Sequence, residues 1–161
     1  MLPSLAPELI SPERRPFVKK LRNFIEDHGF GSVPILVIQC NSDDGVNLEI
    51  GSPRLAQALV HGAGAANYDE WWSAFCGGRS FSVFDGRASR HDSDEPLWVT
   101  EVHEDGHVLA AIRLLPYGNA NAVSPGIVHA FSSFGNLVKK LYAATGVQGR
   151  LKVSCKAKFA S

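Results

Sequence analysis

A chain of 161 residues with 45% hydrophobic and 20% charged side chains has the composition of one ordinary globular domain and not of a disordered protein. No apolar run approaches the roughly 18 residues that a membrane-spanning helix needs, so we expect no membrane association. The formal net charge is zero at pH 7, whereas a dedicated nucleic-acid binder usually has a basic balance overall.

The amino terminus and the cysteines give an expectation for the compartment. The first eight residues contain two prolines and an acidic residue but no basic stretch, which is unlike a secretory signal peptide. Cys40, Cys76 and Cys155 are far apart and odd in number, which predicts free thiols and no disulfide framework or zinc site. We therefore expect a cytoplasmic protein with a flexible lead-in at 1–10 and a single globular domain at 11–161.

The charges are distributed unevenly along the chain. Residues 1–105 hold all 16 acidic residues and 9 of the basic ones, whereas residues 106–161 hold 7 basic residues and no acid. Such a split can mark a binding surface for an anionic partner. The alternative is that the basic end lies against acidic parts of the same domain or faces water.

The chain opens with a predicted helix that begins at Ser11-Pro12-Glu13, where serine suits the cap and proline the first helical position, and ends at Gly29. The continuous apolar run at 33–40 predicts a strand that is central in a sheet. An alternating pattern at 46–50 predicts a half-buried partner strand. Ser52-Pro53 then begins a short second helix.

The middle of the chain predicts a helix at 69–75, a short strand at 80–84 and a polar loop at 87–96. Asp105-Gly106, between two strand-like runs, is a strong signal for a β-hairpin. A two-residue turn there pairs His103 with Val108 and Glu101 with Ala110, so that these side chains share the core-facing side.

The last two elements have the clearest patterns. An amphipathic helix is expected at about 124–145, beginning at Ser124-Pro125, and a strand at about 150–159. The strand alternates between an apolar face and a basic one, and we expect its apolar face to pack against the stripe of the helix. The basic face carries Arg150, Lys152, Lys156 and Lys158.

Together these elements predict an α+β fold in the order α-ββ-αα-β-ββ-α-β. The hairpins and short links favour a mainly antiparallel sheet of about six strands, with the helices packed on one face. Residues 33–115 resemble, by the order of their elements, the sensor domains of the PAS/GAF type. That resemblance implies a small ligand or a partner bound between sheet and helices.

A second resemblance covers the last third of the chain. The run Leu141-Tyr142-Ala143-Ala144-Thr145-Gly146-Val147-Gln148-Gly149-Arg150-Leu151 follows a long helix and is similar to C-terminal regions of bacterial proteins with a Schlafen/AlbA-type putative DNA-binding domain. This resemblance implies an accessory or regulatory domain and not a catalytic one.

Cysteine and histidine supply the candidate for catalysis. Cys76 with His103 or His107 could form a thiolate–imidazolium pair. Cys76 lies near a predicted helix end, however, and activation favours a helix start, so a packed, inert thiol is the competing interpretation. Glu101, His103 and His107 could form a small acid–base or metal cluster, but the expected hairpin register points His107 to the opposite face. We therefore predict neither a metal site nor a cofactor.

Aromatic and basic side chains supply the candidates for binding. Tyr68, Trp71, Trp72 and Trp98 suggest a ligand or partner surface, because adjacent tryptophans on a helix cannot both enter one part of a core. The basic strand face could contact phosphates, or its lysines could protect an exposed edge from aggregation.

The sequence favours a non-catalytic regulatory or interaction domain that senses a small ligand or docks a protein partner. A cysteine/histidine enzyme and an accessory domain that binds nucleic acid or another anionic surface are the alternatives.

Overall fold

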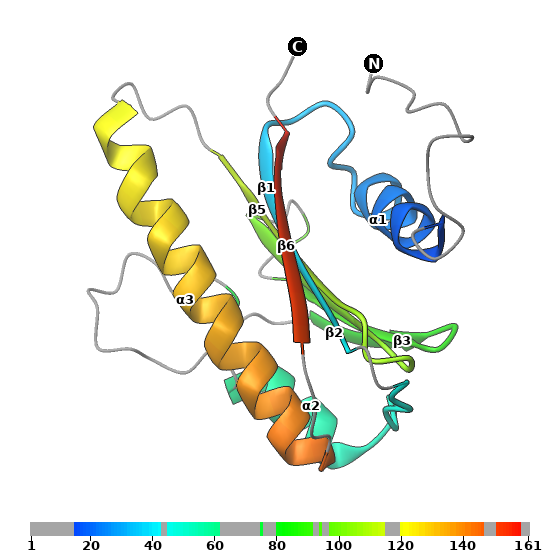
Figure 1. Ribbon diagram of the computed structural model, residues 1–161. Helices are drawn as coiled ribbons and strands as arrows, with labels where there is room; N and C mark the ends of the chain where they lie inside the picture. Colours follow the sequence, from blue (N-terminus) through cyan, green and yellow to red (C-terminus); the bar gives the residue numbers. More distant parts are fainter. Residues whose placement is uncertain are drawn as a thin grey trace.

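Six strands and three helices make up the described part of the chain (Figure 1). The computed structural model describes residues 15–42, 45–61, 75, 80–91, 94, 97–114, 120–146 and 151–158. The helices are α1 (Arg15–Asp27), α2 (Pro53–His61) and α3 (Ala120–Thr145). The strands are β1 (Ile35–Ser42), β2 (Ser80–Phe84), β3 (Arg87–His91), β4 (Trp98–His103), β5 (Val108–Arg113) and β6 (Leu151–Lys158).

All pairings in the sheet are antiparallel, in the spatial order β2-β3-β4-β5-β1-β6. The predicted α+β class and antiparallel sheet of about six strands are confirmed.

Two strands differ locally from the prediction. Residues 46–50 form no strand, although Leu48 N donates to Glu104 O. Residues 87–91, predicted as a polar loop, form β3, in which Ala88 and Arg90 are buried. The predicted helix at 69–75 and lead-in at 1–10 lie outside the described residues apart from Phe75.

The helices cover both faces of the sheet, not one face as predicted. Figure 1 shows α1 on one side of the sheet, with α2 and α3 on the other. The physical reason lies in β1, whose first four residues are all buried. Because successive side chains of a strand point to opposite faces, a continuous apolar strand needs an apolar cover on each side.

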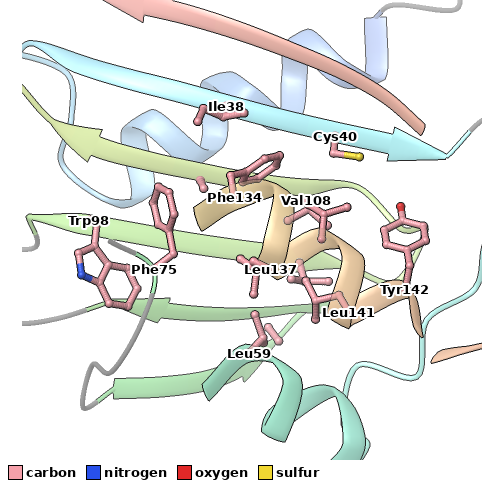
Figure 2. Close-up of a cluster of buried hydrophobic side chains, with 14 of the residues drawn as sticks. Ile38, Cys40, Leu59, Phe75, Trp98, Val108, Phe134, Leu137, Leu141 and Tyr142 are labelled. Atoms are coloured by element: carbon pink, nitrogen blue, oxygen red, sulfur yellow. The ribbon is translucent and has the colours of Figure 1, made fainter. Parts of the chain in front are cut away.

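The larger core lies between the sheet and helices α2 and α3, as Figure 2 shows. Phe134, Leu137 and Leu141 of α3 meet Leu59 of α2 above the sheet. Ser52 Oγ accepts a hydrogen bond from Leu55 N at 3.2 Å, so it caps the first turn of α2 as the Ser-Pro pattern predicts. The apolar stripe of α3 is less continuous than expected, because Val128 and Phe131 are exposed.

The smaller core lies beneath α1. Leu21, Phe24 and Ile25 of this helix pack with Phe30 against the sheet, where β1, β5 and β4 supply the facing side chains. Gly29, at φ 69°, adopts the left-handed conformation that ends many helices and turns the chain toward β1. The facing side chains are Ile35, Val37, Val99, Leu109 and Ala111.

The β4–β5 hairpin is present, but its predicted register is wrong by one residue. Gly106 N donates to His103 O and His103 N donates to His107 O, both at 2.9 Å, so the loop has three residues and not two. Gly106 has φ 82°, as expected of a three-residue hairpin loop that ends on a left-handed glycine. Glu101 therefore pairs with Leu109 and not with Ala110. Because a one-residue shift exchanges faces, the polar side chains at this end meet beneath α1.

The last strand lies at an edge of the sheet, beside β1. Its expected packing against the last helix is incomplete in the described residues. Helix α3 contacts mainly α2, β1 and β5, and Val153 of β6 remains 56% exposed. Among the described helices, none has the length and apolar character required to cross a bilayer.

Candidate functional site

Glu101 of β4 lies at the centre of a group of ionisable side chains between α1 and the sheet. Its side chain is only 1% exposed. Nε2 of His28 lies 3.0 Å from Glu101 Oε2, and Nε2 of His103 lies 2.7 Å from Oε1 in an ion-pair contact outside hydrogen-bond geometry. Arg87 Nη1 donates to both carboxylate oxygens, at 3.3 and 3.4 Å. One buried carboxylate is therefore shared by three nitrogen-bearing side chains. We call these four residues the Glu101 cluster.

Three polar contacts fasten the α1 segment to this end of the sheet. Lys20 Nζ pairs with Asp105 Oδ2 in the hairpin turn. Asp27 Oδ2 accepts from Arg87 Nη2 at 2.8 Å. The contact between His28 and Glu101 is the third. We call these three contacts the ionic clasp.

The spacing of the sequence places the clasp on one side of α1. One face of the helix carries the spacing i, i+4, i+7 and i+8, which corresponds to Lys20, Phe24, Asp27 and His28. Phe24 is fully buried between them and contacts the ring of His28 edge-on, with ring centroids 4.9 Å apart. The apolar anchor and the polar contacts of α1 therefore face the sheet together.

His107 is a second buried polar group at the same end of the sheet, and it is 2% exposed. Its Nε2 lies 3.1 Å from Gln39 Oε1, and its backbone N donates to Asp105 Oδ1 at 3.2 Å. Its ring centroid is 5.9 Å from that of His103. Burial, together with the charges of Lys20 and His103, lowers the pKa of His107 from 6.5 to about 4. His107 is therefore neutral at neutral pH.

Opposing influences act on the pKa of Glu101. Burial favours the protonated form and raises the pKa. His103, His28 and Arg87 favour the carboxylate, and together they outweigh burial. The net result is a pKa of about 2, so Glu101 is ionised at neutral pH although it is almost fully covered.

The arrangement fits the fastening of a helix better than it fits chemical turnover. A general base needs an atom that can reach a substrate, and the carboxylate of Glu101 is directed at its own neighbours. Within the described ranges, no group of three histidine, cysteine or acidic side chains could hold a metal ion. Through its contacts, the cluster joins the α1 segment to strands β3 and β4.

The predicted catalytic residues have different outcomes. Cys76 lies outside the described residues, so its pairing with a histidine stays a prediction. The sequence prediction that His103 and His107 face opposite sides is wrong, because the three-residue loop puts them next to each other. The same shift brings them into one group with Glu101, although a metal role is not supported there.

The predicted binding residues are only partly described. Tyr68, Trp71 and Trp72 lie outside the described residues. Trp98 is buried in the larger core, where it contacts Phe75 edge-on with ring centroids 6.0 Å apart. It also lies against the guanidinium of Arg90. Trp98 therefore packs within the fold and does not face solvent.

The basic residues at the end of the chain lie on or beside the edge strand β6. Lys152 is exposed. Lys156 and Lys158 stand opposite Val37 and Ile35 of β1 in the strand register. Arg150 lies outside the described residues. The proposed anion-binding role of these residues stays a prediction.

The sequence prediction includes no role for several residues of the Glu101 cluster and the ionic clasp. It places Arg87 in a loop, and it places Lys20, Asp27 and His28 in a helix without a polar contact. The sequence does contain a signal for these contacts. Several polar residues of α1 fall on the same helix face as its buried apolar residues. Gln39, a polar residue within an apolar strand, is a second signal, and it contacts His107.

The two edges of the sheet differ in chemistry. Edge strand β2 has the sequence Ser-Phe-Ser-Val-Phe, with no charge and no proline. Its apolar side chains are exposed: Phe81 by 39%, Val83 by 51% and Phe84 by 64%. The opposite edge strand, β6, carries three lysines. We call the exposed strand with these three side chains the β2 edge.

Comparisons with protein-family models, curated proteins and solved structures give no match to this chain. The fold and the site thus define the class, an α+β domain with a two-sided antiparallel sheet and a buried ion-pair cluster. The resemblances to PAS/GAF domains and to Schlafen/AlbA-type proteins stay predictions.

Proposed function

We propose that this chain is a non-catalytic interaction and regulatory domain, and that its partner at the β2 edge is a second copy of the same chain. The β2 edge is the observation that carries the proposal. An exposed edge strand offers unpaired backbone groups, and proteins usually block such an edge with lysine, proline or a bulge. In the described residues, β6 has such lysines, whereas β2 has three exposed apolar side chains instead.

The sequence of β2 favours a copy of itself as the occupant. Two β2 strands that pair antiparallel about Ser82 place Phe81 of one chain opposite Val83 of the other, twice. Directly opposed residues of antiparallel strands share a face, and aromatic residues pair well with β-branched ones. No like charges meet in this register, because β2 has none. Such a contact is isologous and closes after two copies.

The filled core supports docking of a partner over sensing of a small ligand. A ligand between the sheet and the helices would need space there. Among the described residues, Leu59, Phe75, Trp98 and Phe134 already pack together in that layer. The cysteine/histidine enzyme and the anion-binding strand remain alternatives, since Cys76 and most of the basic face are not described. A cytoplasmic location is part of the proposal.

Replacing Val83 with lysine is expected to weaken self-association by more than about tenfold, because two lysines would be placed in the contact. Sedimentation velocity over a range of protein concentrations measures the change. The unmodified chain should behave as a dimer, and Val83→Lys should shift it to the monomer. Circular dichroism checks that the variant folds.

Val153→Lys is the matched control, because Val153 is similarly exposed, by 56%, and lies on the opposite edge of the sheet. This variant should remain a dimer. A monomeric unmodified chain at the highest attainable concentration would contradict the proposal. Equal effects of the two lysines would contradict it as well, since they would indicate a general charge effect and not a contact at β2.

A further inference from the structure

His107 lies where the hairpin, the sheet and α1 meet. It is buried, and its neighbours Asp105 and His103 connect it to the ionic clasp. Asp105 accepts from His107 N and also pairs with Lys20 of α1. The ring centroid of His103 lies 5.9 Å from that of His107. His103 also pairs with Glu101, and Glu101 contacts His28. A charge placed on His107 would therefore act on two of the three clasp contacts.

The groups that face His107 come from several elements. Helix α1 contributes Lys20, with Asp27 and His28 farther along the same face. Strand β4 contributes Glu101 and His103, and the hairpin loop contributes Asp105. Strand β1 contributes Gln39, which has no charge. Arg87 of β3 stands opposite His103, and Lys152 of β6 stands opposite Asn41, so both lie farther out on this side of the sheet.

We propose that His107 is an acid sensor within the fold, and that its protonation loosens α1 from the sheet while the sheet and α3 remain intact. The proposal goes beyond self-association and holds whether or not the chain forms dimers. A proton on His107 adds a buried cation beside Lys20 and His103. The new charge opposes Lys20, which α1 needs for its contact with Asp105.

The electrostatic balance around His107 supports this direction. Lys20 and His103 act with burial against protonation of His107, while Asp105 and Glu101 only partly oppose them. Mild acid therefore drives a proton onto a site that the docked helix disfavours. The site becomes more favourable for the proton when α1, with its lysine, moves away. Proton uptake and release of the helix are thus linked, and each favours the other.

The consequence is an apolar surface that appears on acidification. Phe24 and its neighbours on α1 cover Val37, Val99 and Leu109, which are fully or almost fully buried. Loosening of α1 exposes this side of the sheet without breaking a strand pairing. Among the described residues, the core on the α3 side contains no residue of the clasp.

Hydrogen exchange read by mass spectrometry tests the proposal, with the intrinsic exchange rate corrected at each pH. Between neutral pH and about pH 5, backbone protection of residues 15–27 should fall at least about tenfold, while protection of 130–145 changes little. His107→Gln keeps a polar group beside Gln39 but cannot take up the proton, so its α1 should lose this pH dependence. His91→Gln, on the same side of the sheet but on β3, should keep it.

Parallel loss of protection in both helices would overturn the proposal, because it would indicate global unfolding. So would an unchanged pH dependence of α1 in His107→Gln. If that variant does not fold, Lys20→Met provides the second test. Removing this cation should weaken α1 protection at every pH and also reduce its dependence on pH. An undiminished dependence in Lys20→Met would count against His107 as the sensor.

Discussion

Replacing Glu101 with alanine is expected to lower the free energy of unfolding by about 3–5 kcal/mol. The substitution removes the only acid in the Glu101 cluster and leaves His28, His103 and Arg87 around an unfilled site. Nitrogen-bearing groups that lose a buried partner must be desolvated without compensation, which is costly. Equilibrium unfolding in urea, followed by circular dichroism at neutral pH, measures the loss.

Glu104→Ala is the matched control, because Glu104 is an exposed acid three residues farther along the same hairpin. Its effect on the free energy of unfolding should stay within about 0.5 kcal/mol, as for most surface substitutions. Similar losses in the free energy of unfolding for both variants would show that Glu101 contributes no more to stability than an exposed acid does. An effect below about 1 kcal/mol for Glu101→Ala would also contradict the assigned role.

The stability of the domain is expected to fall as the pH drops below about 6.5. His107 titrates near 6.5 in the unfolded chain and near 4 in the folded one. Between these values the unfolded chain binds the proton and the folded chain does not, so acid favours unfolding. The shift corresponds to about 3 kcal/mol at the lower end of the window, where the full effect is reached. Glu101 adds a further loss as the pH falls from 4.5 toward about 2.

Urea unfolding at a series of pH values distinguishes the two contributions. His107→Gln should flatten the profile between 6.5 and about 4 and leave the loss at lower pH. His91→Gln should follow the unmodified protein throughout. The assignment fails if the slope between these pH values is the same in His107→Gln as in the unmodified chain.

Elements with strong local patterns could be predicted from the sequence. The apolar run of β1, the Ser-Pro start of α2, the stripe of α3 and the alternation of β6 each reflect a local rule of capping or periodicity. Such rules predict an element but not its neighbours. The strand order β2-β3-β4-β5-β1-β6, with β1 inserted beside β5, depends on contacts between distant segments.

The cluster could not be predicted because it depends on the length of one turn. Asp105-Gly106 is compatible with both a two-residue loop and a three-residue loop. The choice decides on which face Glu101 and His103 lie relative to His107. The wrong choice split the group in the sequence prediction. Arg87 was missed for a different reason, since its strand, Arg-Ala-Ser-Arg-His, has one apolar residue and no apolar pattern.

Local sequence patterns also did not show that α1 covers the second face of the sheet. Helix α1 reads as an ordinary amphipathic helix, and nothing in its periodicity says which side of the sheet it occupies. The apolar run of β1 indicates that both faces of the sheet are covered. Its four successive buried residues require apolar neighbours on both faces. Helix α1 is the element that meets this requirement opposite α2 and α3.

Pairing of two copies through β2 is tested most directly by a disulfide at the proposed twofold axis. In that register Ser82 faces Ser82 of the second copy, at the Cα separation of about 4.5–5.5 Å that directly opposed strand residues have and a disulfide accepts. With Cys76→Ser and Cys155→Ser as background, Ser82→Cys should form a covalent dimer under mild oxidation and return to the monomer on reduction. Ser89→Cys, one strand farther in, should remain monomeric. Absence of the Ser82→Cys dimer, or equal cross-linking at both positions, would contradict pairing through β2.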